Sequence, residues 1–335
     1  MKRPASLAFV VSLLLAGTLA GAFASGGPPS HIAIVVTGDG RADLHSERPE
    51  DRDCFNAQVA AEIRDATLRE KANALLWSGD LASGTNSRCP PLRKELESWV
   101  NVMEPLYKKK VMVLAVRGNH EAHSADSVKV WNEVFSGPHR MPSTGPAEAK
   151  NLTYWVTIGN VLILGIDQYA MGTELSPVPW VRQTLEDHGQ EHVFAFGHEP
   201  AFMSGAHKDN LSANAKNRDE FIEALMDAGS QAYFAGHDHF YDHMIATDDQ
   251  GRSIHQIVAG TAGAPEYDDR GYTQASPGWK TERVMHVPKE NGKGDVYGYV
   301  LVEVDGPKAT LTFKGRTGPG TYVPMDTWSY TAKAP

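Results

Sequence analysis

The chain has 335 residues, with 41 acidic and 32 basic side chains and a formal net charge of -9. Its hydrophobic fraction of 41% and charged fraction of 22% are typical of globular proteins, so the composition excludes a disordered or coiled-coil chain. The acidic balance argues against general binding to nucleic acid or to anionic membranes. The two cysteines exclude a disulfide scaffold and a zinc module with four cysteine ligands, so a metal site must use histidines and carboxylates.

Residues 1–24 have the pattern of a secretory signal peptide. Lys2 and Arg3 precede an apolar run over residues 5–20, and small side chains before Ser25 predict cleavage after Ala24. An N-terminal membrane anchor is the alternative, but the run is short for a membrane span and no charge cluster follows it. We therefore expect a secreted or periplasmic protein that keeps no membrane anchor after cleavage.

Export changes the expectation for the two cysteines. In an oxidising compartment Cys54 and Cys89 are expected to pair as a disulfide. Two buried free thiols are the alternative. On the loop-entropy account, closing a loop of this size contributes about 3–4 kcal/mol to stability.

Five short apolar runs share one pattern, in which the run is followed directly by a glycine and then by a possible metal ligand. The runs cover residues 31–37, 74–78, 111–117, 192–196 and 231–235, and they lead to Asp39, Asp80, Asn119, His198 and the pair His237 and His239. Such runs suit strands that are buried on both faces, and the helical patterns between several of them indicate α/β architecture. Because ligands bind beyond the carboxyl ends of strands in such sheets, we expect these six side chains to meet in one crevice.

Other segments have the pattern of antiparallel strands and suggest a second sheet. They cover residues 152–169, 241–247, 253–258 and a C-terminal hairpin at about 296–315. Residues 260–292 show no period and have the composition of a long connection. Since we find no internal repeat or linker, residues 25–335 are predicted to form a single domain of two packed sheets, with the C-terminal hairpin in the second sheet.

The six candidate ligands have a definite chemistry. Hard oxygen donors mixed with imidazoles suit zinc, manganese or iron rather than calcium or magnesium alone. Six donors exceed the needs of one catalytic metal with an open position, and they fit two metals that share a bridging carboxylate. Two such metals are suited to clamp the attacking and leaving oxygens of an in-line phosphoryl displacement.

Four motifs in this chain resemble the signature of the calcineurin-like metallophosphoesterases, a superfamily related to the purple acid phosphatases. They are G-D-x-x at residues 79–82, G-N-H-E at 118–121, G-H at 197–198 and G-H-x-H at 236–239. Each string is common by itself, but the four occur in the family's order and each follows a predicted strand. The resemblance covers about residues 32–240. It implies an α/β fold, a four-layer αββα sandwich of two mixed β-sheets flanked by helices.

The resemblance also implies roles for individual residues. Asp80 would bridge two divalent or trivalent metal ions (Mn, Fe or Zn). Asp39 and His239 would bind the first metal, and the second would be bound by Asn119, His198 and His237. His120 would face the substrate, stabilise the phosphoryl charge and protonate the leaving oxygen, while a metal-bound hydroxide attacks phosphorus. Glu121 would orient the loop from outside the ligand shell.

The first motif departs from the family pattern. Where the family usually has D-x-H, this chain has Asp39-Gly40-Arg41, and a guanidinium cannot ligate a metal. The purple-acid-phosphatase branch is not matched either, because its tyrosine ligand is replaced by Ser83. Three explanations stay open: His45 supplies the missing ligand, water fills the place, or Arg41 binds the substrate phosphate, which is compatible with either. An ion pair of Arg41 with a nearby carboxylate is the non-catalytic alternative.

Other polar residues are less specific. His123 follows the G-N-H-E motif and is a further candidate for the cleft. His207 and Lys208 lie on a predicted loop and are expected to be solvent-exposed rather than directed at the substrate. His243 is expected to pack on a strand, and Asp167 to have a structural role.

The sequence thus predicts an exported, metal-dependent phosphoric ester hydrolase that acts on a small-molecule phosphomonoester. A phosphodiesterase or pyrophosphate-bond hydrolase on the same site is the alternative chemistry, because such enzymes differ mainly in their pocket loops. A phosphate-binding homologue without catalysis is the alternative from another class, favoured by Arg41 at the first motif. The sequence carries no indication of the oligomeric state.

Overall fold

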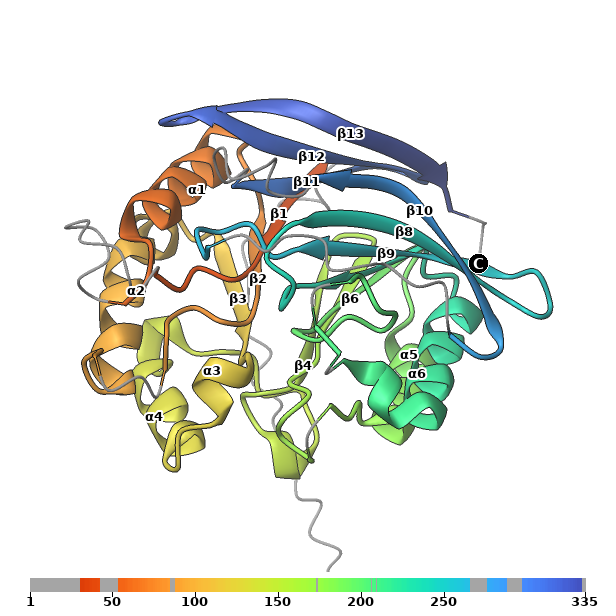
Figure 1. Ribbon diagram of the computed structural model, residues 1–335, viewed down its shortest axis with the longest axis horizontal. Coiled ribbons are helices and arrows are strands. Elements are labelled where there is room, and N and C mark those ends of the chain that lie inside the picture. The colour runs from red at the N-terminus through yellow and green to blue at the C-terminus, as the bar shows by residue number, and fades with distance from the viewer. Residues whose placement is uncertain are drawn as a thin grey trace, which may run out of the picture.

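The structure is a computed structural model of the chain. It describes residues 31–42, 54–84, 88–172, 174–205, 207–208, 210–265, 276–287 and 297–332. Within these ranges the strands form two mixed sheets, one of six and one of seven strands. The sheets face each other, and helices cover the outer face of each (Figure 1). This is the four-layer αββα sandwich that the sequence predicts.

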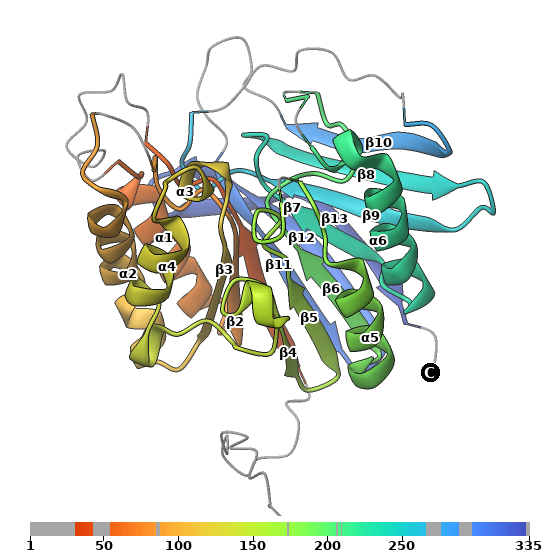
Figure 2. The same ribbon diagram turned by 90° about the horizontal axis from the view of Figure 1, so that it is seen from below.

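The six-stranded sheet has the order β13-β12-β11-β1-β2-β3. Its strands are β1 (Ile32–Thr37), β2 (Ala74–Ser78), β3 (Met112–Val116), β11 (Gly298–Asp305), β12 (Lys308–Gly318) and β13 (Thr321–Thr331). The first three are parallel, so their carboxyl ends meet at one edge. Its outer face is covered by α1 (Ala57–Arg69), α2 (Leu92–Lys108) and α4 (Ser127–Val134) (Figure 2).

The seven-stranded sheet has the order β10-β8-β9-β7-β6-β5-β4. Its strands are β4 (Tyr154–Ile158), β5 (Val161–Gly165), β6 (His192–Phe196), β7 (Ala232–Ala235), β8 (Tyr241–Asp248), β9 (Ser253–Ala259) and β10 (Trp279–Val287). Helices α5 (Val178–His188) and α6 (Ala215–Asp227) cover its outer face (Figure 2). The shorter elements are α3 (Asn119–Ala122), η2 (Gly137–His139), η3 (Ala147–Ala149) and η4 (Leu211–Asn214).

The elements form where apolar spacing and local capping agree. In α1, Val59 and Ile63 are four residues apart and buried, and the Asn56 side chain accepts a hydrogen bond from the Val59 N–H at 3.1 Å. This side-chain cap satisfies one of the first free amides of the helix. Strands β1 and β2 are buried along their whole length, as expected for strands with a sheet neighbour on each side and layers above and below.

The core has two parts. One lies between the sheets and under the α1 and α2 side, where it contains Val35 and Trp77 of one sheet and Phe194 of the other. The second lies between the seven-stranded sheet and its helices, where Phe221 of α6 packs edge-on against Tyr233 of β7. Because both sheets share the first core, their strand ends are fixed relative to each other.

Two sequence predictions about the sheets are wrong. The hairpin at about 296–315 does not join the sheet of β8 and β9, because β11 pairs antiparallel with β1, with Ile34 opposite Val302. Strand β2 occupies one edge of β1, so the other edge is the one that β11 fills. The segment 260–292, read as a connection, contains β10, which extends the seven-stranded sheet beyond β8. Strand pairing depends on which edge is open, and local sequence does not encode this.

The disulfide that the sequence predicts is present between Cys54 and Cys89, whose Cα atoms are 5.7 Å apart. The predicted signal peptide over residues 1–24 and the candidate ligand His45 lie outside the described residues. Within the described ranges, no helix combines the length and the apolar character needed to span a membrane.

Candidate metal centre

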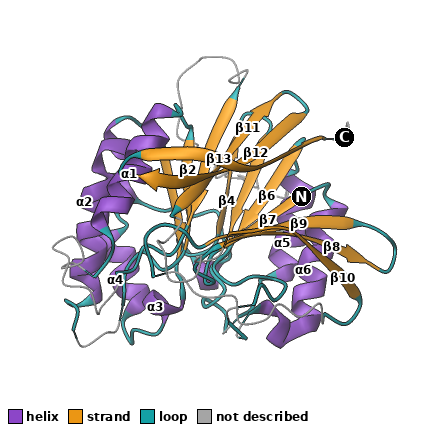
Figure 3. Ribbon diagram, turned by 45° about the horizontal axis from the view of Figure 1, so that its top comes forward, coloured by secondary structure: helices purple, strands orange, loops and turns teal. Residues whose placement is uncertain are grey.

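The six predicted ligands follow strands of both sheets. Asp39, Asp80 and Asn119 come after β1, β2 and β3 of one sheet, and His198 and the pair His237 and His239 come after β6 and β7 of the other. These ends lie on the side of the molecule where loops gather between α3 and α6 (Figure 3). The fold therefore brings residues that are up to 200 positions apart to one edge of the sandwich.

Three of these residues have left-handed backbone conformations. The φ angles are 62° at Asp39, 49° at Asp80 and 69° at His237. Such conformations cost on the order of 1–3 kcal/mol each for a residue with a side chain, and they occur preferentially at functional sites. The turns are held together by backbone hydrogen bonds, in which the Asp39 N–H donates to the carbonyl of Gly79 and the Gly40 N–H donates to the backbone carbonyl of Asp80.

Glycines next to the ligands allow the loops to approach one another. A Cβ atom on Gly118 would lie 2.0 Å from Oδ1 of Asp80, and one on Gly236 would lie 2.2 Å from Oδ2 of Asp39. Real Cβ contacts are never this short. The glycine that precedes a ligand in these motifs is thus required for space as well as for the turn.

A first group of donors consists of Asp39, Asp80 and His239. Each offers an atom within 4.8 Å of the other two, and all three residues are buried. His239 Nε2 lies 3.5 Å from Asp39 Oδ1, and its Nδ1 lies 2.7 Å from the carbonyl of Pro265. With Nδ1–H donating to that carbonyl, the lone pair of Nε2 points to the carboxylates, as in a metal-ligating histidine.

A second group, His198 and Asn119, also lies next to Asp80. His198 Nε2 is 2.9 Å from Oδ1 of Asn119 and 3.5 Å from Oδ1 of Asp80. Its Nδ1 lies 2.8 Å from the carbonyl of Ser78, which fixes the same tautomer as in His239. Burial lowers the pKa of His198 to about 4, so the ring is neutral and able to ligate at neutral pH.

His237 joins the two groups. Its backbone N–H donates to both carboxylate oxygens of Asp39, and its ring centroid is 5.0 Å from that of His198. Nε2 of His237 lies 3.5 Å from Oε2 of Glu199, whose other oxygen accepts a hydrogen bond from the Tyr169 hydroxyl. Sequence reasoning missed Glu199 and Tyr169; the position of Glu199 directly after the G-H motif was the available signal.

The charges of the site fit bound metal ions. Burial and the neighbouring Asp80 carboxylate raise the pKa of Asp39 well above its usual value. Burial opposes ionisation of Asp80, but the electrostatic effect of His120, His198, Arg41 and His237 holds its pKa below the usual range. Two buried carboxylates beside imidazoles with fixed tautomers form a donor set that cations complete, since unpaired buried charges are costly. The residues present therefore fit two metals, with Asp80 between the two groups.

His120 and Glu121 lie on α3, next to Asn119. The His120 N–H donates to Oδ1 of Asp80 at 3.1 Å, and its Nδ1 lies 2.9 Å from the carbonyl of Ser83. Nε2 of His120 is 3.8 Å from Oδ2 of Asp80, and the side chain is 29% exposed, so a substrate can reach it. Glu121 is buried and accepts hydrogen bonds from the backbone N–H groups of Asp80, Ala82 and Gly118, which ties the two loops together.

The remaining candidates differ in position. Arg41 lies near the site, and its positive charge acts to lower the pKa values of Asp39, Asp80 and His239. The backbone of Arg41 also forms an isolated bridge with Phe55. His123 ends α3, where its backbone N–H donates to the carbonyl of Asn119, and its imidazole makes none of the contacts described above.

One loop residue was expected to be solvent-exposed and instead lies at the site. His207 stacks on His237, and its Nδ1 lies 2.7 Å from Oδ1 of Asp238. Its side chain is 28% exposed, whereas Lys208 beside it is exposed as expected. No sequence signal distinguishes His207, because its place depends on the loop fold.

His243 and Asp167 have partners of their own. His243 forms an ion pair with Asp326, and Asp167 forms a buried ion pair with Arg117.

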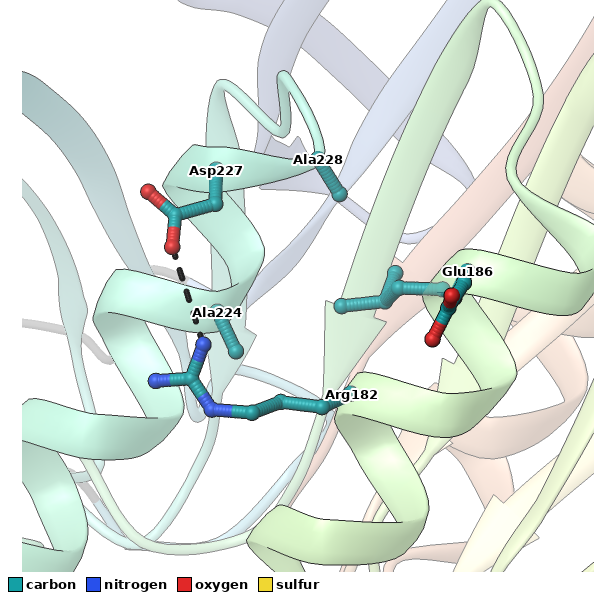
Figure 4. A pocket seen from close by; sticks show the side chains of 6 residues that line it. Arg182, Glu186, Ala224, Asp227 and Ala228 are labelled. Carbon is teal, nitrogen blue, oxygen red and sulfur yellow. Dashed lines mark ion pairs between the residues drawn. The ribbon is translucent and has the colours of Figure 1, made fainter.

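Two other features do not add a site. Cys54, Cys89 and Glu95 also lie close together, but the cysteines are joined as a disulfide and offer no thiolate ligands. A pocket of about 260 Å³ lies between α5 and α6, where Arg182 and Asp227 form an ion pair (Figure 4). None of the predicted site residues lines this pocket.

The comparison with protein families agrees with the geometry. A family model described as calcineurin-like phosphoesterase matches residues 41–241, which is more than half of the chain. The chain belongs to this family. The matched region contains all the predicted ligands except Asp39, which lies two residues before it. No curated protein sequence matches the chain.

Several solved structures share the fold at low sequence identity. A purple acid phosphatase from yellow lupin (Lupinus luteus) has a TM-score of 0.61 and 14% identity over 90% of this chain, which spans 54% of that structure's length. A dimetal phosphatase from Danio rerio has a TM-score of 0.57 and 15% identity, over 90% of this chain and 99% of the other. The Plasmodium protein GAP50, described as the anchor in the inner membrane complex, has a TM-score of 0.57 and 14% identity, over 91% and 90%.

Proposed function

We propose that the protein is a dinuclear-metal phosphohydrolase that acts on small-molecule phosphomonoesters outside the cytoplasm. One observation carries the proposal: the buried group of Asp39, Asp80 and His239 lies directly beside the pair Asn119 and His198. The family and its purple acid phosphatase and dimetal phosphatase neighbours support hydrolysis of phosphoesters. The disulfide supports an oxidising compartment.

The residues divide between two metal ions. Asp39 and His239 would hold one ion, Asn119, His198 and His237 would hold the other, and Asp80 would contact both. When bound, the ions would supply positive charge for the phosphoryl oxygens and make a water molecule nucleophilic near neutral pH. Their identity is proposed as Mn, Fe or Zn from the mixture of oxygen and nitrogen donors.

The chain's own residues would handle the proton and the substrate charge. His120 keeps Nδ1 against the Ser83 carbonyl, so its protonated form has Nε2–H available for the leaving oxygen. His207 is held by Asp238 and contributes a second imidazole at the site. Arg41 is proposed to bind the substrate phosphate, because a guanidinium suits contact with two phosphate oxygens.

Metal analysis joined to activity measurement tests the proposal. The purified protein is expected to contain close to two equivalents of Mn, Fe or Zn and to hydrolyse a generic phosphomonoester faster than a phosphodiester. Asp80→Ala should lose metal and turnover, whereas His120→Ala should keep its metal and lose turnover. If both variants keep full turnover, the site assignment is wrong. A higher rate on the diester or on a pyrophosphate bond would shift the proposal to that chemistry.

A non-catalytic role is the second candidate. Arg41 replaces the usual histidine ligand, and GAP50, which has the same fold, is described as an anchor. Against this role, His120, His237 and His239 are all present and all lie at the site. Absence of turnover on every ester with each of the three metals would favour the non-catalytic role.

A further inference from the structure

The segment Cys54–Asn56 contacts the loop that carries the first predicted metal ligand. Its carbonyl at Cys54 accepts a hydrogen bond from the Ala42 N–H at 3.3 Å, and the Asn56 N–H donates to the Gly40 carbonyl at 2.7 Å. Between these two bonds, Phe55 forms a β-bridge with Arg41. We call Cys54–Asn56 the bracket. The bracket therefore fixes the backbone that follows Asp39.

The bracket also contacts the loop that supports His120. The Cys54 carbonyl accepts hydrogen bonds from the Ser83 N–H at 3.0 Å and from the Ser83 hydroxyl at 2.9 Å. The carbonyl of Ser83 in turn lies 2.9 Å from Nδ1 of His120. Ser83 thus links Cys54 to the imidazole of His120, which is proposed to protonate the leaving group.

The disulfide ties this bracket to the segment that leads into α2. Cys54 has a left-handed backbone, with φ of 60°, and its partner Cys89 lies three residues before the first residue of α2. From α2 itself, Glu95 accepts a hydrogen bond from the Gly84 N–H at 3.0 Å. Gly84 packs so closely that a Cβ atom there would lie 2.0 Å from the carbonyl of His120. The loop under His120 is therefore held from the bracket and from α2, and the disulfide joins the two supports.

We infer that the Cys54–Cys89 disulfide is a positioning cross-link for His120, so that its reduction lowers hydrolysis in the folded protein. The inference rests on the proposed function, in which His120 protonates the leaving oxygen. Reduction by a dithiol such as dithiothreitol oxidises that reagent to its cyclic disulfide and leaves Cys54 and Cys89 as two thiols. Oxidised glutathione reverses the step by thiol exchange. The bracket then keeps its hydrogen bonds but loses its covalent tie.

Two substrates separate loss of positioning from general damage. A para-nitrophenolate leaving group needs little protonation, whereas an alkoxide leaving group needs a positioned acid. In the variant Cys54→Ser/Cys89→Ser, kcat for ethyl phosphate is expected to fall at least about tenfold more than kcat for para-nitrophenyl phosphate. Dithiothreitol treatment of the wild type should give the same pattern, and oxidised glutathione should restore the rates. Circular dichroism and metal analysis establish that each sample is folded and loaded.

Arg316→Met is the control for stability alone. It removes the ion pair with Glu62 between β12 and α1, in which no residue of the bracket takes part, and it should change both rates by the same factor. If the folded double variant also changes both rates equally, the disulfide is merely structural and the inference is wrong.

A second readout does not depend on turnover. Carbethoxylation of His120 by diethyl pyrocarbonate, followed by mass spectrometry, should be at least about threefold faster in the double variant, because Nδ1 is less firmly held. An unchanged modification rate would contradict the inference. Wild-type protein that hydrolyses neither ester would instead contradict the proposed function, and the modification rate would still decide the role of the disulfide.

Discussion

The imidazole of His207 stacks on that of His237, with ring centroids 4.1 Å apart and ring planes inclined by 29°. Asp238 fixes this arrangement, because its Oδ1 accepts the His207 backbone N–H at 3.0 Å and lies 2.7 Å from the ring Nδ1. A residue of an irregular loop is thereby held beside a predicted metal ligand. His207 presents a partly exposed ring at the site without belonging to any of the motifs.

His207→Ala is expected to lower kcat about 10- to 100-fold and to leave the metal content unchanged. The imidazole lies beside the predicted ligands rather than among them, so its loss is expected to remove a polar contact to the proposed substrate and no coordination bond. Steady-state kinetics with metal analysis measures both effects. Lys208→Ala is the matched control, because this neighbour is exposed and should keep wild-type kinetics. Full turnover in His207→Ala would show that the ring does not act on the substrate.

Gly118→Ala is expected to lower metal content and activity together. The added Cβ would lie 2.0 Å from Oδ1 of Asp80 and must displace that carboxylate. Gly318→Ala provides the comparison, since a Cβ there meets nothing within 4 Å and the backbone is not left-handed. Metal content after gel filtration is the measurement. Equal metal content in the two variants would mean that the close approach of Gly118 and Asp80 is not needed for binding.

Arg41→His tests the departure in the first motif. The new imidazole offers a lone pair where the family has a ligand, and it removes a positive charge that acts on Asp39 and Asp80. We expect metal to be retained against dialysis at least about tenfold longer. We also expect KM to rise several-fold, because a phosphate contact is lost. If neither metal stoichiometry nor turnover changes, the first metal is not short of a ligand.

Glu95→Gln tests a buried carboxyl group. Burial raises the pKa of Glu95 to about 8, against an ordinary value of 4.5, and its Oε1 has no hydrogen-bond partner among the described residues. The folded state thus binds this proton more tightly than the unfolded state. The contribution of this bound proton to the free energy of unfolding is therefore fully present below pH 4.5 and is lost as the pH rises through about 8.

The free energy of unfolding, from urea titrations between pH 5 and 9, measures this effect. Glu95→Gln keeps an acceptor for the Gly84 N–H and carries no proton to lose. Relative to wild type, it should gain on the order of 3 kcal/mol across this range. Glu97→Gln, an exposed position on the same helix, should follow wild type. Parallel curves for wild type and Glu95→Gln would mean that Glu95 is not protonated in the folded protein.

The two-sheet α/β architecture and the side chains at the strand ends can be predicted from the amino-acid sequence. Both are local properties: a continuous apolar run specifies a buried strand, and a glycine after it specifies a turn that presents the next residue. Asp39, Asp80 and Asn119 were therefore identifiable before any contact was known. Once export was predicted, the pairing of Cys54 and Cys89 followed from their number alone.

The pairing of the strands and the contacts between distant groups depend on the tertiary fold. Strand β11 joins β1 because that edge is open, and β10 extends the other sheet from a segment with no period of its own. His207 and Glu199 reach His237 because the loop that follows β6 packs against the turn that follows β7. Such contacts are selected by long-range packing and by the burial of charge. These forces act between segments far apart in the chain, where no local pattern records them.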